Sequence, residues 1–190
     1  LATETGAGAL FWNRRYDAAG IAIDKAIKAD LAVRMQVESF NGKLLREPWE
    51  FTTKTGGPFR VFTPFWRALL ASAPPDAPLP APRALNPAPR PSGARALDAL
   101  GLLPTKPDWA AGLRESWTPG EAGAVARLHA FLDGALADYT DGRDRPAMAA
   151  TSRLSPHLAY GEISPRQILA ATRHAADAHS RLRGEADKFL

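Results

Sequence analysis

The chain has 190 residues, with 24 lysines and arginines against 20 aspartates and glutamates, and its formal net charge is +4 at pH 7. It contains no cysteine, which excludes disulfides, a thiolate nucleophile and a cysteine zinc site among these residues. No apolar run approaches the roughly 20 residues that a membrane helix needs, and the basic balance mildly favours a polyanionic partner such as nucleic acid.

The first forty residues predict a strand, a helix and a second strand. Residues 10–16 begin as a short aromatic strand and end polar, and Asp17 can begin a helix over residues 19–31. The predicted buried positions of that helix, four residues apart, are Ile23, Ile27 and Leu31. The apolar residues that then alternate as in a strand are Val33, Met35 and Val37. This order predicts a parallel βαβ unit, the last part of a larger α/β domain, because two strands do not form such a domain alone.

A proline-rich stretch divides the chain. Before it, Thr63 and Pro64 predict the N-cap and first residue of a helix. Residues 71–91 then hold eight of the 17 prolines, a composition typical of an extended connector rather than of a helix or central strand. The predicted domains are therefore an α/β part over 1–70, a linker over 71–107 and a helical part over 108–190.

The helical part begins with the clearest helix signal in the chain. Thr118-Pro119-Gly120-Glu121 reads as a capping box with proline at the first helical position. The predicted buried stripe behind it consists of Val125, Leu128, Leu132 and Leu136. Tyr139 continues this stripe with its ring turned inward, and Asp141-Gly142 ends the helix. The remainder to residue 190 is predicted to be helical with short polar turns.

The stretch from Thr151 to Pro165 contains two Ser-Pro pairs, Ser155-Pro156 and Ser164-Pro165, each of which predicts an N-cap followed by a first helical residue. A helix N-terminus behind Ser155, with the hydroxyls of Thr151 and Ser152 beside it, would suit a phosphate or pyrophosphate. Simple helix capping explains the same pattern. The arginines near this turn favour the anion, although they could also form a solvated face paired with Asp141 and Asp144; they are Arg143, Arg145 and Arg153.

Other patterns give little support to other chemistries. The four histidines show no spacing typical of a metal site and are expected to be structural or solvent-exposed; they are His129, His157, His174 and His179. The five tryptophans are expected to serve packing. No GxSxG, P-loop or GxGxxG motif occurs, so a hydrolase or a nucleoside triphosphatase is not supported.

Several motifs, in order, resemble those of the DNA photolyase and cryptochrome family. Residues 138–147, 151–158 and 161–166 look like the start of its flavin-binding helical domain, and residues 11–16 and 61–65 look like the later part of its α/β antenna domain. The resemblance implies the end of a Rossmann-like parallel-sheet antenna domain, a proline-rich linker and the start of an all-α FAD-binding domain. Within the family, the chain most resembles the bacterial class I cyclobutane pyrimidine dimer photolyases.

The resemblance also implies site residues and cofactors. It places the FAD pyrophosphate on the turn formed by Thr151, Ser152, Arg153, Leu154 and Ser155. Tyr139 matches a tyrosine that contacts the flavin nucleotide, and Arg143 matches an arginine that contacts DNA near the lesion. Asn13 matches, less securely, a position at the antenna chromophore, which is a methenyltetrahydrofolate or a deazaflavin. No metal is implied.

The function implied is light-driven repair, in which photoexcited reduced FAD gives an electron to a pyrimidine dimer flipped out of DNA. The alternatives are a cryptochrome-type photoreceptor of the same fold without repair, and a basic helical nucleic-acid module. The chain begins with Leu1 and stops in a helix-like run, which predicts a fragment of a longer protein. We expect that longer protein to be a cytoplasmic monomer. The family's catalytic residues lie downstream of Leu190, so this chain alone is expected to bind FAD weakly at best and to repair nothing.

Overall fold

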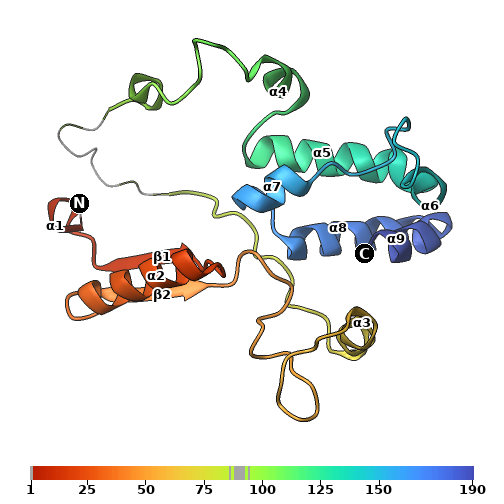
Figure 1. The fold of residues 1–190 in the computed structure, drawn as a ribbon, viewed down its shortest axis with the longest axis horizontal. Helices are drawn as coiled ribbons and strands as arrows, with labels where there is room; N and C mark the ends of the chain where they lie inside the picture. The colour runs from red at the N-terminus through yellow and green to blue at the C-terminus, as the bar shows by residue number, and fades with distance from the viewer. Residues whose placement is uncertain (1, 86, 88–92, 94) are drawn as a thin grey trace. The chain divides into compact units, whose positions relative to one another are not determined.

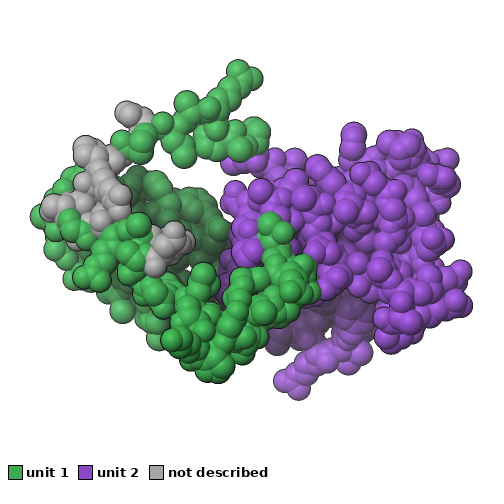
Figure 2. Space-filling model, turned by 90° about the horizontal axis from the view of Figure 1, so that it is seen from above, with its two compact units in different colours: residues 1–40, 80–118 green, residues 41–79, 119–190 purple. Residues whose placement is uncertain are grey.

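The computed structural model describes residues 2–85, 87, 93 and 95–190. These form two compact units (Figure 2): unit 1 comprises residues 1–40 and 80–118, and unit 2 comprises residues 41–79 and 119–190. Part of the predicted proline-rich linker, residues 86, 88–92 and 94, lies outside the described residues. The domain limits at 70 and 107 stay predictions.

Unit 1 contains a parallel two-stranded sheet (Figure 1). It consists of β1 (Ala9–Asn13) and β2 (Gln36–Phe40), whose register runs from Ala9 opposite Gln36 to Asn13 opposite Phe40. The strands are joined by α2 (Ala18–Leu31), which confirms the predicted βαβ unit. Three further short helices of this unit are α1 (Ala2–Thr5), η1 (Leu97–Leu100) and α4 (Ala111–Ser116).

Helix α2 begins where the sequence predicts, but it buries a different face. Asp17 is the N-cap, and its Oδ1 accepts the N–H of Gly20 at 2.7 Å. The buried residues of the helix are Gly20 and Asp24, whereas Ile23 is 49% exposed, so the predicted apolar stripe is wrong at that position. The second strand also starts later than predicted, because Val33 is 83% exposed in a turn and pairing begins at Gln36.

The first segment of unit 2 carries one helix, α3 (Phe62–Ala71). Its N-cap is Val61 rather than the predicted Thr63, and Phe62 in its first turn stacks on Trp66 with ring centroids 6.1 Å apart. Pro64 then lies in the first turn, where its missing N–H costs no intrahelical bond. Residues 73–79 form no helix or strand.

The second segment of unit 2 is helical and holds the apolar core. Its elements are α5 (Glu121–Asp133), η2 (Ala135–Asp138), α6 (Tyr139–Gly142), α7 (Ser155–Tyr160), α8 (Pro165–Ala178), η3 (Ser180–Leu182) and α9 (Arg183–Phe189). The core residues are Ala124, Leu128, Phe131, Leu132, Leu136, Leu154, Ile163, Ile168 and Leu182. No helix among the described residues is long and apolar enough to span a membrane.

Two details of the predicted start of α5 are wrong. The N-cap is Gly120, with φ at +96° and no side-chain capping bond, so the Thr118 capping box does not form. Glycine tolerates this backbone conformation, which is unfavourable for residues that have a Cβ atom. The buried stripe includes Leu128, Leu132 and Leu136 as predicted, but Ala124 takes the place of Val125, which is 39% exposed.

Candidate functional site

The turn over residues 151–155 presents polar groups on one side and anchors itself in the core on the other. The side chain of Leu154 is 2% exposed and belongs to the apolar core, so only its backbone is available to a ligand. Thr151, Arg153 and Ser155 are exposed, and Ser152 is half-buried. Arg153 has φ at +54°, a left-handed conformation that non-glycine residues adopt at a cost of about 1–2 kcal/mol.

The two Ser-Pro pairs behave differently. Ser164 is the N-cap of α8 and forms the full capping box, since its Oγ accepts the N–H of Gln167 at 3.2 Å and its own N–H donates to Gln167 Oε1 at 2.8 Å. Ser155 is not a cap, because α7 has Leu154 at that position. The hydroxyl of Ser155 therefore has no capping role, and within the described residues it has no hydrogen-bond partner.

The short helix α7 adds little dipole. It has only six residues, so the positive end of its dipole contributes little. The groups of the turn that would suit an anion are the hydroxyls, the backbone N–H groups and the Arg153 guanidinium.

A close backbone contact brings the two polar motifs together. Gly142 is buried at the end of α6, and a Cβ built on it would lie 2.4 Å from the Cβ of Ala150. Ala150 is itself 4% exposed and directly precedes the turn. A side chain at position 142 would collide, so glycine lets the end of α6 rest against the start of the turn.

Tyr139 is the first residue of α6 and Arg143 is its C-cap. The Tyr139 ring packs edge-on against Phe131 and Phe189, with centroid distances of 5.8 and 5.3 Å, which confirms the predicted inward ring. The Arg143 guanidinium lies 5.6 Å from the Tyr139 ring centroid, within cation–π range. Its Nε also approaches Asp144 Oδ1 at 3.5 Å, so the predicted pairing with Asp144 is present but long. Arg145 is exposed and has no ion pair within the described residues.

Sequence reasoning missed a buried histidine contact next to the turn. His157 on α7 is 2% exposed, and its Nδ1 lies 2.5 Å from Glu162 Oε2. The His157 ring and then the N–H of Gly120 hold the pKa of Glu162 below its usual range. Gly161, with φ at +74°, turns the chain between the two residues, and this Gly-Glu pair after a short helix is the signal that could have predicted the contact.

The end of the sheet in unit 1 carries the predicted antenna residue. Asn13 is the last residue of β1 and is exposed opposite Phe40. Close to it, Arg14 Nη2 donates to the Ser39 carbonyl at 2.6 Å, and Lys28 Nζ donates to Ser39 Oγ at 2.8 Å. Ligands of parallel α/β sheets bind at the carboxyl ends of strands, so Asn13 lies at an edge suited to one.

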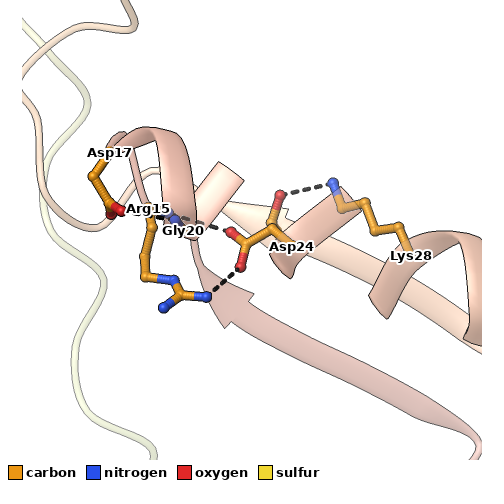
Figure 3. A network of polar contacts seen from close by, with 6 residues as sticks. Arg15, Asp17, Gly20, Asp24 and Lys28 are labelled. Carbon is orange, nitrogen blue, oxygen red and sulfur yellow. Dashed lines mark hydrogen bonds and ion pairs between the residues drawn. The ribbon is translucent and has the colours of Figure 1, made fainter. Parts of the chain in front are cut away.

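A second polar cluster fixes α2 beside that edge (Figure 3). Arg15 reaches Asp24 twice, through its Nη2 at 3.3 Å and its backbone N–H at 3.4 Å. The pKa of Asp24 is lowered, first by the neighbouring indole N–H of Trp12 and then by Arg15, while burial acts in the opposite direction. This carboxylate joins β1, the loop after it and α2.

Comparisons with known proteins agree with the motifs. The family model described as DNA photolyase matches residues 1–83. A deoxyribodipyrimidine photo-lyase of Agrobacterium fabrum is 53% identical over 176 residues, which are 91% of this chain and 36% of that protein. The crystal structure of a bacterial class III photolyase from Agrobacterium tumefaciens matches with a TM-score of 0.87 and 48% identity, over 98% of this chain and 39% of that chain. The chain belongs to the DNA photolyase and cryptochrome family.

Cryptochromes match as well. Cryptochrome-1 of Arabidopsis thaliana is 35% identical over 86% of this chain and 24% of that protein. The match to the photolyase crystal structure confirms the photolyase-like fold, helical with a small parallel sheet. This chain spans between a quarter and two fifths of the length of these photolyase and cryptochrome relatives.

Proposed function

We propose that the whole protein is a light-dependent DNA repair flavoenzyme, a deoxyribodipyrimidine photolyase, which acts as a carbon–carbon lyase on cyclobutane pyrimidine dimers. The observation that carries the proposal is the turn over 151–155, whose free hydroxyls are held beside Tyr139 and Arg143 by the Gly142–Ala150 contact. The 53% identity to a deoxyribodipyrimidine photo-lyase supports the same activity.

The residues of this turn fit the pyrophosphate of FAD. Thr151, Ser152 and Ser155 offer hydroxyl donors, Arg153 offers a guanidinium, and Leu154 offers its backbone while its side chain fixes the turn in the core. Tyr139, half-buried and packed against Phe131 and Phe189, would lie along the nucleotide. When bound, photoexcited reduced FAD supplies the electron that splits the dimer.

Arg143 is the proposed contact with damaged DNA. Its guanidinium rests on the Tyr139 ring and keeps 37% of its side chain exposed, so it could reach a phosphate without leaving that support. A dimer pairs and stacks poorly, which lowers the cost of about a few kcal/mol for flipping a nucleotide out of the duplex. The contact between Arg143 and the Tyr139 ring supports a DNA contact next to the proposed flavin contact.

The class and the antenna are further parts of the proposal. The motifs predict class I, whereas 48% identity to a class III photolyase structure favours class III for this protein. We expect an antenna chromophore, either a methenyltetrahydrofolate or a deazaflavin, with Asn13 as a contact at the sheet edge. We also expect a cytoplasmic monomer.

A cryptochrome-type photoreceptor is the second candidate. The 35% identity to cryptochrome-1 of Arabidopsis thaliana supports it, because the same turn and fold would serve light signalling without repair. The proposed DNA contact of Arg143 favours repair, since such a contact is useful to a protein that binds DNA.

The decisive experiment measures flavin content and dimer repair by the full-length protein, in light and in dark. We expect bound FAD and repair only in light. A double variant, Thr151→Ala with Ser155→Ala, should weaken FAD binding about tenfold through loss of two hydroxyl bonds, whereas Ser180→Ala, an exposed serine on η3, should not. Bound flavin without light-dependent repair would favour the photoreceptor, and absence of flavin would contradict both candidates.

A further inference from the structure

A three-residue contact outside the proposed ligand contacts holds the start of the helical core together; we call it the Glu162 clamp. Glu162 binds the ring of His157 through a 2.5 Å contact and accepts the N–H of Gly120. Its backbone N–H also donates to the His157 carbonyl at 2.9 Å. The side chain of His157 is 3% exposed and that of Glu162 is 22% exposed, so water competes little for the contact. The clamp thus joins α7, the turn before α8 and the start of α5.

The short helix α7 depends on such contacts. Helices of six residues are unstable alone, and α7 has no side-chain cap at its N-terminus. Besides the clamp, its first turn is fixed by buried Leu154, whose carbonyl accepts the N–H of Leu158 at 2.9 Å. The backbone that carries Thr151 to Ser155 runs directly into this helix, so movement of α7 moves the turn.

The turn itself requires support. Arg153 adopts a left-handed backbone conformation, which persists only where the surrounding structure holds it. On one side the turn is held by the contact of Ala150 with Gly142, and on the other side by α7 and its clamp. The clamp is therefore one of the supports that flank the strained residue, together with buried Leu154 and the Ala150–Gly142 contact.

We propose that Glu162 and His157 are positioning residues, which fix α7 and thereby hold the turn over 151–155 in the conformation that receives the phosphate groups of FAD. Neither residue contacts the ligand in this proposal, which rests on the proposed flavin function. The histidine that the sequence predicts to be merely structural or solvent-exposed thus serves the binding site.

The test compares FAD affinity and thermal stability in the full-length protein, at a temperature well below unfolding. Glu162→Ala should raise the Kd for FAD about tenfold, because it leaves His157 and the Gly120 N–H without their shared acceptor. Glu162→Gln retains an acceptor of the same length and should restore affinity to within about threefold of the wild type. Leu182→Ala is the control, since it opens the same core on η3 and should lower Tm without changing the Kd.

Glu162→Asp covers the case in which the alanine variant does not fold. It keeps the charge but is one methylene too short to reach both partners, and should raise the Kd about threefold or more. The inference is overturned if the wild type binds FAD and the folded Glu162→Ala or Glu162→Asp variant binds it equally well, or loses affinity only as much as Leu182→Ala does. A wild type that binds no FAD would instead overturn the proposed function.

Discussion

The β1–α2–β2 part of unit 1 and the helical part of unit 2 are held together by different forces. In the described residues of unit 1 only Gly20 and Asp24 are buried, and neither has an apolar side chain. The helical part buries nine apolar side chains in one cluster. Unit 1 relies on its strand ladder and on polar contacts of Asp24 and Ser39, whereas the helical part relies on apolar burial.

The difference teaches where each part is vulnerable. A cavity in the helical core removes packing that nothing else replaces. Loss of a partly exposed polar contact costs less free energy, because water hydrates the groups that lose their partner. The candidate flavin turn is joined to the core by Leu154, so its stability depends on that of the helical part. The sheet edge at Asn13 belongs to the β1–α2–β2 part, whose described residues include no buried apolar side chain.

The largest expected effect comes from Leu136→Ala in the helical core. Leu136 is 0% exposed, and truncation should cost about 3 kcal/mol of unfolding free energy through lost burial and a residual cavity. Denaturant unfolding of the full-length protein, followed by far-UV circular dichroism, measures it. Val125→Ala, at a position 39% exposed, is the control and should cost less than about 1 kcal/mol. Equal losses in both variants would show that Leu136 contributes no more to stability than the partly exposed Val125 does.

The helical core was largely predictable because its periodicity is strong. Leu128, Leu132 and Leu136 follow the 3.6-residue repeat and are buried. The repeat alone did not predict Phe131 or Ala124, since helix rotation depends on what packs against it. In unit 1 the same rule failed at Ile23, because a helix over two strands buries only the narrow face that meets them, here Gly20 and Asp24.

The candidate site was predictable in its residues and not in its supports. Local signals predicted the cap at Ser164 correctly, because both partners of a capping box lie within four residues of sequence. Ser155 carries the same Ser-Pro signal, but the N-cap of α7 is Leu154, one residue before the serine. The clamp of His157, Glu162 and Gly120 joins residues up to 42 positions apart, and such contacts arise from tertiary packing that local patterns do not contain.

A smaller effect, within the stronger part, is expected from Gly142→Ala. The added methyl would lie 2.4 Å from Ala150 Cβ, and relief of this collision should cost about 2 kcal/mol and displace the turn over 151–155. Gly184→Ala on α9 is the matched control, because nothing lies within 4 Å of its Cβ position and alanine favours a helix. The control should raise unfolding free energy slightly, by up to about 1 kcal/mol. Denaturation midpoints and FAD affinity measure both effects. Unchanged stability in Gly142→Ala would show that Ala150 can move away from position 142 at little cost in free energy.

The smallest effect, and the sharpest test of the weaker part, is expected from Asp24→Asn. The pKa of Asp24 lies below its ordinary value of 3.8 in the folded protein, so its contribution to stability is fully present above that value and is lost as pH falls through the folded pKa. The variant removes this acid dependence from unit 1 while leaving the helical core intact. The indole N–H signal of Trp12, followed by NMR, should shift below pH 4 in the wild type and stay constant in the variant. Because Asp24 joins β1 to α2 through Arg15, an identical acid response in both proteins would mean that the apolar contacts of α2, rather than its polar ones, hold unit 1 together.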